Sequence, residues 1–179
     1  THLSAAETTA LAASGVVAGL CPTTEANLGD GIFPAAEFAG KTAIGSDSNV
    51  TISVAEELRQ LEYSQRLRDR SRNVLARGPN ASTGRSLLDA ALDGGAQALD
   101  QPVGSIAIGK RLDVAVLDTG HAAMVGRSGD QLLDSWIFSG GNAVVKDMIV
   151  AGAHIVQDRH HIREAEILSP YSTTVRRFT

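Results

Sequence analysis

In the N-terminal part of the chain, short apolar segments alternate with capped helical segments, and this alternation constrains the fold more than any other feature. The apolar segments Val16–Leu20 and Thr42–Ile44 each run into a polar loop. Ser4–Glu7 and Ser53–Glu56 both have the capping-box pattern, in which a serine and a glutamate satisfy the first helical amides. Strand and helix units in this order imply parallel strands joined by crossover helices. The sequence therefore predicts an α/β fold.

The spacing predicts the following elements along the chain. We expect helices over about 5–14, 34–38, 53–75 and 85–92, the last ending at Gly94-Gly95 before a helical turn through 96–99. A glycine-bearing loop is expected over 22–33. Beyond Pro102 the pattern favours strands over 112–117, 144–150 and 154–156, with one helix over about 130–138. The last two strands form a hairpin that turns at Ala151-Gly152, and Pro170 is expected to break any long helix in the tail.

This change of character after Pro102 predicts three parts, over residues 1–102, 103–161 and 162–179. A chain of 179 residues can bury one sizeable core, but a complete eight-stranded α/β barrel typically needs about 250 residues. The chain has no initiating Met, so we expect a further segment to precede it.

Composition excludes some functional classes. The net charge of −4 and the pI near 5.7 argue against a nucleic-acid partner, and the arginines between Arg66 and Arg72 are interpreted as a solvated helix face. No apolar segment approaches the ~20 residues of a membrane span, so no membrane partner is expected. Cys21 is the single cysteine, so the chain can form no internal disulfide, which suits a reducing compartment.

Three chemically capable residues follow predicted strand ends. His2, Cys21 and Asp47 would lie at the same edge of a parallel sheet, where α/β-barrel enzymes keep their catalytic groups. Asp47 could bind a metal or act as a base, or it could only cap a turn. His2 could exchange a proton near neutral pH, or it could be a disordered terminal residue. Cys21 is most simply a small buried apolar residue.

Other polar residues have weaker patterns. Glu25, Asn27 and Asp30 could contact a substrate, or their glycine-flanked segment could be only a tight connection. His160-His161 lies on a polar segment where solvation is the simpler interpretation. The sequence contains no paired-cysteine zinc motif, Walker loop or dinucleotide fingerprint.

Several segments together resemble the deaminase/chlorohydrolase branch of the amidohydrolase superfamily. The resembling segments are 19–31, 44–49, 94–99, 104–118, 150–152 and 158–160. Within that branch, Thr24–Pro34 and Leu61–Arg70 are similar to the formimidoylglutamate deiminases. The resemblance implies the C-terminal portion of a TIM (β/α)8 barrel, about strands six to eight with their helices, followed by a small β-sandwich-type domain over 103–161.

The resemblance also implies roles for two residues. His2 corresponds to the histidine that ends strand six, a catalytic acid/base in this branch. Asp47 corresponds to the strand-eight aspartate, which binds zinc and accepts a proton from the attacking water. The other ligands of the single zinc belong to strands one and five of the family. We therefore expect this chain alone to be inactive.

The implied reaction is zinc-dependent hydrolysis of N-formimino-L-glutamate to N-formyl-L-glutamate and ammonia, a step of histidine degradation. The resemblance further implies a cytoplasmic homodimer that acts on a small molecule. Two alternatives stay open: another deaminase of the branch, acting on a purine, cytosine or triazine, and a non-catalytic fragment that associates through its half-barrel.

Overall fold

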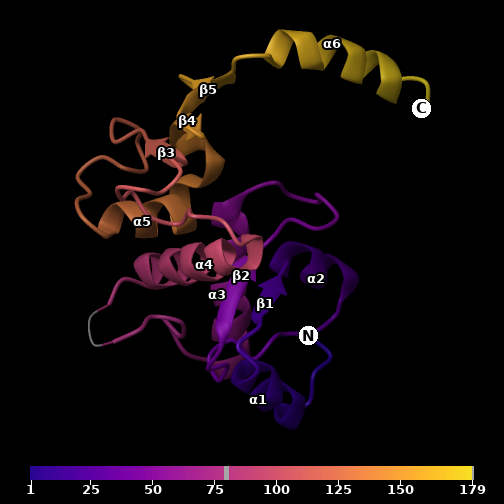
Figure 1. Cartoon of the computed structure of the whole chain (residues 1–179), viewed down its shortest axis with the longest axis vertical. Coiled ribbons are helices and arrows are strands. Elements are labelled where there is room, and N and C mark those ends of the chain that lie inside the picture. The colour runs from indigo at the N-terminus through magenta and orange to yellow at the C-terminus, as the bar shows by residue number, and fades with distance from the viewer. Residues whose placement is uncertain (79–80, 179) are drawn as a thin grey trace.

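The computed structural model describes residues 1–78 and 81–178. Its N-terminal part contains a pair of parallel strands with helices around it (Figure 1). Val17 lies opposite Lys41, and Leu20 opposite Ile44. The elements are α1 (Ala5–Ala13), β1 (Val17–Leu20), α2 (Pro22–Leu28), β2 (Lys41–Ile44), α3 (Val54–Asp69) and α4 (Thr83–Leu99). The predicted α/β fold is therefore confirmed.

The long helix α4 packs directly onto β2 at a glycine. A Cβ atom built on Gly94 would lie 1.9 Å from the carbonyl oxygen of Thr42, so only glycine allows this approach. The prediction that Gly94-Gly95 ends the helix is wrong, because here the glycine serves packing rather than termination. The helix continues to Leu99 and ends at Asp100, which has a φ of +48°.

Two other predicted boundaries also change. The expected loop over 22–33 begins with α2, because Pro22 takes the first helical position and Glu25 Oε1 accepts the Cys21 amide at 3.0 Å. The helix predicted to reach residue 75 ends at Asp69, where Arg70 adopts a left-handed conformation with φ +51°. The prediction of a helix over 34–38 is also wrong, because these residues form only a turn, in which the Phe38 amide donates to the Pro34 carbonyl at 3.0 Å.

The C-terminal part contains an antiparallel sheet in the order β3-β4-β5-β6. The hairpin between β4 and β5 turns at Ala151-Gly152 as predicted, with both residues at positive φ. The elements are β3 (Val114–Leu117), α5 (Gln131–Ser135), the π-helix η1 (Trp136–Gly140), the 3-10 helix η2 (Gly141–Val144), β4 (Val145–Val150), β5 (Ala153–Gln157), β6 (His160–His161) and α6 (Glu164–Val175).

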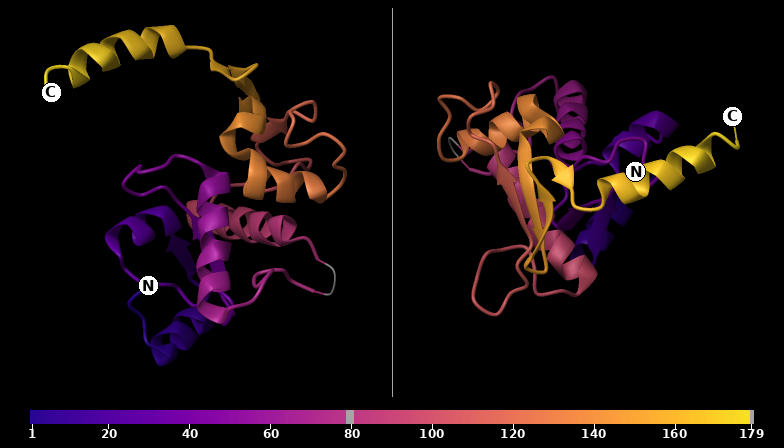
Figure 2. Two further views of the ribbon diagram at one scale, coloured as in Figure 1. Left: turned by 180° about the vertical axis from the view of Figure 1, so that it is seen from behind. Right: turned by 90° about the horizontal axis from the view of Figure 1, so that it is seen from above.

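The tail is a helix that extends away from the rest of the chain (Figures 1 and 2). Pro170 lies inside α6, so the prediction that it breaks a long helix is wrong. A proline removes only one backbone donor, and none of the α6 residues is buried, so the chain around Pro170 has room to adjust. Thr179 lies outside the described residues. Within those residues, no helix is long and apolar enough to cross a bilayer.

The hydrophobic core lies between the parallel strands and the helices α3, α4 and η1. Its buried members include Leu20, Leu58, Leu87 and Ile137. The core thus extends from β1 across α3 to the helical segment that precedes the antiparallel sheet. The predicted division at Pro102 stays a prediction.

Candidate active site

The carboxyl ends of β1 and β2 lie side by side. The Gly45 amide donates to the Leu20 carbonyl at 3.0 Å, which continues the parallel pairing one residue past β2. A Cβ atom on Gly45 would lie 3.4 Å from Cys21 Sγ, so the thiol lies against the start of the next loop. The structure therefore brings Cys21 and the loop of Asp47 to one edge, as the parallel arrangement predicts.

The Cys21 thiol lies among carboxyl groups. Burial raises the pKa of Cys21, and the charges of Asp47, Glu25 and Glu57 raise it further. A raised pKa keeps the thiol protonated near neutral pH, so Cys21 is a poor nucleophile. This agrees with its interpretation as a small apolar residue, and it identifies Asp47 and Glu57 as neighbours of the same strand end.

Asp47 lies exposed in a tight turn after β2. Its φ is +42°, and Asn49 also has a positive φ, of +55°. The Asn49 amide donates to the Ser46 carbonyl at 3.0 Å, and Ser46 Oγ donates to Asn49 Oδ1 at the same distance. The following helix α3 is capped by Ser53, which accepts the Glu56 amide at 3.2 Å. Asp47 is therefore not the cap of α3, and its carboxylate is exposed to solvent.

The exit of this loop is tied to the C-terminal part of the chain. Ser53 Oγ donates to Asn142 Oδ1 at 2.8 Å, and Asn142 Nδ2 donates to the Ile52 carbonyl at 3.0 Å. A cavity of about 660 Å³ lies at this junction, with Ser46 and Glu57 among the residues on one side and Met148 of the antiparallel sheet on the other. The Asp47 loop is therefore held at both ends.

His2 lies before α1, apart from these contacts. Its imidazole is 80% exposed, and Nε2 is 3.6 Å from Asp30 Oδ1, just beyond α2. The chain begins at Thr1, so no described strand precedes this residue. Among the described residues, no hydrogen bond or ion pair joins His2 to Asp47. The convergence of these two side chains on one pocket stays a prediction.

A buried carboxyl group lies beneath the site. The sequence analysis did not identify it. Glu57 is 1% exposed, accepts the Thr23 amide at 2.9 Å and also accepts a hydrogen bond from Thr23 Oγ1. It thereby caps α2, because Cys21 at the cap position makes no side-chain bond. A signal was available: Glu57 shares the buried side of α3 with Leu58 and Leu61, where a charged residue needs a partner.

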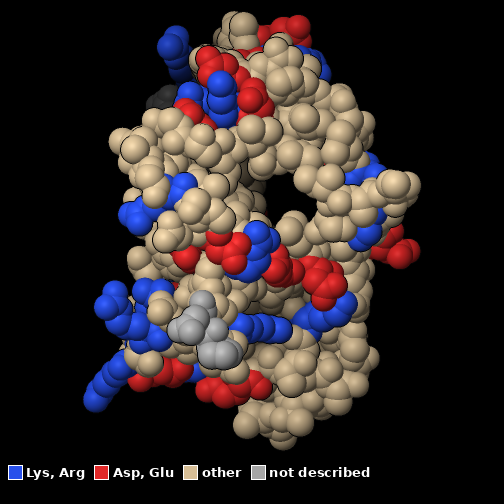
Figure 3. Space-filling model, turned by 90° about the vertical axis from the view of Figure 1, so that its left-hand side faces the viewer, with Lys and Arg blue, Asp and Glu red and all other residues tan. Residues whose placement is uncertain are grey.

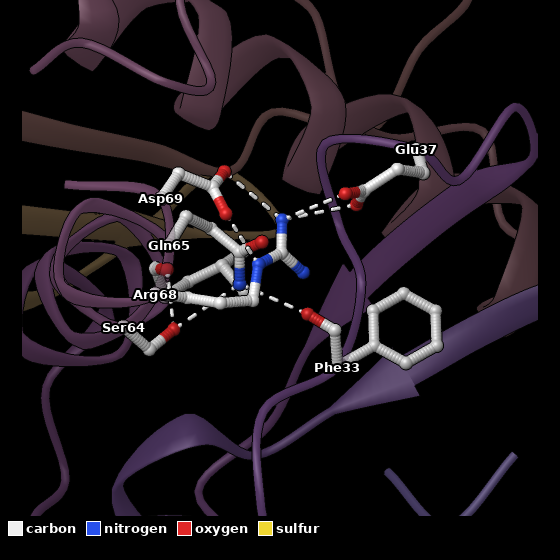
Figure 4. A network of polar contacts seen from close by, with 7 residues as sticks. Phe33, Glu37, Ser64, Gln65, Arg68 and Asp69 are labelled. Carbon is white, nitrogen blue, oxygen red and sulfur yellow. Dashed lines mark hydrogen bonds and ion pairs between the residues drawn. The ribbon is translucent and has the colours of Figure 1, made fainter. Parts of the chain in front are cut away.

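The loop that follows α2 is fixed on the same helix (Figure 4). Gln65 Nε2 donates to the Phe33 carbonyl at 2.9 Å, and Arg68 pairs with Glu37 at 3.0 Å and with Asp69 at 2.6 Å. Arg66 likewise pairs with the buried Glu62 at 2.6 Å. The segments Thr24–Pro34 and Leu61–Arg70, which carry the finer resemblance, are therefore joined by the bond from Gln65 to Phe33.

Acidic and basic side chains lie next to each other across the surface shown in Figure 3. Arg85 pairs with Asp89 and Asp130, and Lys41 pairs with Asp93, which joins α4 to β2. The predicted solvated helix face is wrong for Arg66 and Arg68, because their ion-paired side chains on α3 are only 23% and 26% exposed.

The described residues do not contain a complete metal site. Over 1–78 and 81–178, no group of three or more His, Cys, Asp or Glu residues is arranged to hold a metal ion. The remaining histidines have local partners: His154 lies 3.2 Å from Asp147, and His160 lies 3.0 Å from Glu164. A catalytic zinc ion takes three protein ligands besides its water, so Asp47 alone could not hold one.

The sequence matches known proteins over most of its length. It is 56% identical over 167 residues to a formimidoylglutamate deiminase of Pseudomonas aeruginosa, which covers 92% of this chain and 37% of that protein. It is 30% identical to a 5-methylthioadenosine/S-adenosylhomocysteine deaminase of Pyrococcus abyssi over 83% of this chain and 34% of that protein. The chain thus spans little more than a third of these relatives.

Solved structures agree with this match. An amidohydrolase from Brucella melitensis superimposes with a TM-score of 0.87 at 45% identity, over 97% of this chain and 38% of that one. A zinc-bound adenosine deaminase from Xanthomonas campestris gives 0.83 at 25% identity, over 99% of this chain and 40% of that one. The profile of the Amidohydrolase family matches residues 1–155. The resemblance read from the sequence is confirmed, and this chain belongs to the amidohydrolase family.

Proposed function

We propose that this chain is the part of a formimidoylglutamate deiminase that forms about strands six to eight of a TIM barrel and most of a small β-sandwich-type domain. The complete enzyme would hydrolyse N-formimino-L-glutamate to N-formyl-L-glutamate and ammonia. The single observation that carries the proposal is the 56% identity to the Pseudomonas aeruginosa deiminase over 92% of the chain. The contact between Thr24–Pro34 and Leu61–Arg70 supports it, because these segments form one packed unit.

The reaction adds water across the C=N bond of the formimino group. Asp47 would accept a proton from the attacking water as its oxygen bonds to carbon, and the departing nitrogen would leave as ammonia after receiving protons. His2 would stabilise the tetrahedral centre. A carboxylate in an exposed turn at a strand end suits the role of base, since a bound substrate can reach it.

Zinc is proposed as the metal of the complete enzyme. The structural relative from Xanthomonas campestris contains bound zinc, and Asp47 supplies a donor atom of the right kind. The described residues do not fit a whole zinc site, so the other ligands must come from the additional two-thirds that the relatives contain. A cytoplasmic location and a homodimeric enzyme are proposed with the activity, on the strength of the deiminase match alone.

Replacement of Asp47 tests the proposal in the complete enzyme, meaning this chain together with the segment that the deiminase has in addition. We expect Asp47→Ala to lower ammonia release from N-formimino-L-glutamate by about a thousandfold or more, because metal binding and proton transfer would both be lost. Asp89→Ala changes an exposed carboxylate on α4 and should leave the rate unchanged. A near-normal rate for Asp47→Ala would end the assignment.

Another deaminase activity is the second candidate, favoured by the match to a 5-methylthioadenosine/S-adenosylhomocysteine deaminase at 30% identity. A panel of formimino, purine, cytosine and triazine substrates, read by ammonia release, separates the two. A non-catalytic fragment is the third candidate, favoured by the incomplete metal site. Stoichiometric zinc in the complete protein would exclude it.

A further inference from the structure

We propose that Glu57 is a positioning residue that fixes the turn carrying Asp47 through the N-terminus of α2. The inference rests on the proposed function for its catalytic consequence, but its structural basis is independent. Both oxygens of Glu57 already accept hydrogen bonds from Thr23, one from the amide and one from the hydroxyl. Glu57 is therefore not free to exchange a proton with substrate, and it acts through its neighbours.

The contacts run from α3 to the catalytic turn in two steps. Glu57 holds Thr23, and the adjacent Thr24 donates from Oγ1 to the Ser46 carbonyl at 3.3 Å. Thr24 is 2% exposed, and its contact with Ser46 is partly buried. Ser46 directly precedes Asp47. A shift of α2 would therefore move the backbone from which the Asp47 carboxylate projects.

The location of Glu57 supports this role over general stabilisation. Glu57 lines the same cavity as Gly45 and Ser46, so it lies directly under the turn. Its charge also acts on Cys21, the residue at the end of β1. Glu57 thus lies close to both strand ends that form the site, although it belongs to neither strand.

Glu62 provides a matched comparison on the same helix. It is 0% exposed and accepts hydrogen bonds from Arg66 Nε at 2.6 Å and from the amides of Val74 and Leu75 at 3.0 and 2.9 Å. Its partners hold the segment after α3, whereas the partner of Glu57 is Thr23 in the first turn of α2, beside the strand ends. Both are buried acceptors on α3, but only Glu57 is connected to Asp47.

The first test uses the complete enzyme and whichever panel substrate the wild-type protein turns over. We expect Thr23→Val, which removes one donor to Glu57, and Glu57→Gln to lower kcat by about tenfold to a hundredfold with KM changed less than about twofold, because misplacing a reacting group slows chemistry. Thr23→Ser retains the hydroxyl and should restore kcat. Glu62→Gln should lower the melting temperature but leave kcat unchanged.

The second test needs no activity and uses this chain. Cys21 is its only cysteine and lies beside the turn, so its rate of reaction with a disulfide reagent such as DTNB reports opening of the strand ends. We expect Thr23→Val, which leaves every charge in place, to raise that rate by about fivefold, and Thr23→Ser and Glu62→Gln to leave it unchanged.

The outcomes separate the two proposals. Turnover of a purine but not of N-formimino-L-glutamate would overturn the proposed function and leave the role of Glu57 to be judged on the purine. Equal effects of Glu57→Gln and Glu62→Gln on kcat, or an unchanged Cys21 rate in Thr23→Val, would overturn the positioning role.

Discussion

The parallel strands and the antiparallel sheet of this chain are stabilised in different ways. β1 contributes the buried Ala18 and Leu20 to the core and is closely covered by helices, whereas none of the residues in β3 to β6 or in α6 is buried. Parallel strands are joined by a crossover, usually a helix, and both faces of a parallel sheet are usually covered by helices. Antiparallel strands can be joined by a tight turn, and one face of their sheet can be exposed to water. The strand β1 is therefore stabilised by burial under helices, whereas the antiparallel sheet depends on the pairing of its strands, including the distant pairing of β3 with β4.

The largest expected effect concerns the contact between α4 and β2. Gly94→Ala would place a Cβ atom against the Thr42 carbonyl, and we expect the free energy of unfolding to fall by about 3 kcal/mol or more. Gly95→Ala is the control, since nothing lies within 4 Å of its added carbon, and better helix propensity should raise stability by up to about 1 kcal/mol. Urea denaturation measures both. Equal destabilisation would show that α4 does not pack as described.

A core truncation on α3 comes next. Leu58 is 1% exposed, so Leu58→Ala should lower the free energy of unfolding by about 2–5 kcal/mol through lost burial and the cavity left behind. Leu67 lies on the same helix but is 81% exposed, and Leu67→Ala should change stability by less than about 0.5 kcal/mol. Similar values for the two would mean that the helix buries a different face.

The third prediction tests the part of the chain that contains the antiparallel sheet by measuring how stability depends on pH. The bond from Arg159 lowers the pKa of Asp118 below its ordinary value, and the Gly120 amide lowers it further. A lowered folded-state pKa stabilises the protein above the unfolded pKa of about 3.9, and this stability is lost as the pH falls through the folded value. Asp118→Asn should therefore lower the urea midpoint slightly at pH 7.

The difference between Asp118→Asn and the wild type should shrink as the pH falls below about 4, because the wild-type carboxylate is then protonated as well. Asp158→Asn is the control, since its carboxylate is 77% exposed and lies 3.6 Å from the same arginine. A difference that grows in acid would contradict the assigned sign.

The smallest effect on overall stability is expected in the tail. Pro170→Ala restores a backbone donor inside α6, so far-ultraviolet circular dichroism should show more helix. The melting temperature of the rest of the chain should not change, because α6 buries none of its residues. A clear rise in that temperature would reveal contacts that tie α6 to the core.

Features set by adjacent residues were predictable from the sequence. The capping box at Ser4–Glu7 and the hairpin at Ala151-Gly152 both form as expected, because each depends on a few neighbouring residues. The continuity of α4 was not predictable, since Gly94 looks like a helix terminator until Thr42 is known to lie against it. Pro170 misled for a different reason: α6 continues through the proline, although the residue is unfavourable inside a helix.

The candidate site likewise contains features that were predictable from the sequence and features that were not. Parallel pairing alone placed Cys21 and Asp47 at one edge. The periodicity of α3 could have indicated that Glu57 is buried, but not that its partner is Thr23, which lies 34 residues earlier in the chain. The convergence of His2 with Asp47 stays a prediction, since within the described part of the chain His2 pairs with Asp30 instead.

The pairing of β1 with β2 has a practical consequence. Among the described residues each of these strands has one neighbour, so each leaves a row of backbone amides and carbonyls without a partner strand. Unpaired strand edges of this kind can pair with extended segments of other molecules. Preparations of the isolated chain should accordingly become turbid as concentration rises, and co-expression with the additional portion that the relatives contain should keep them clear.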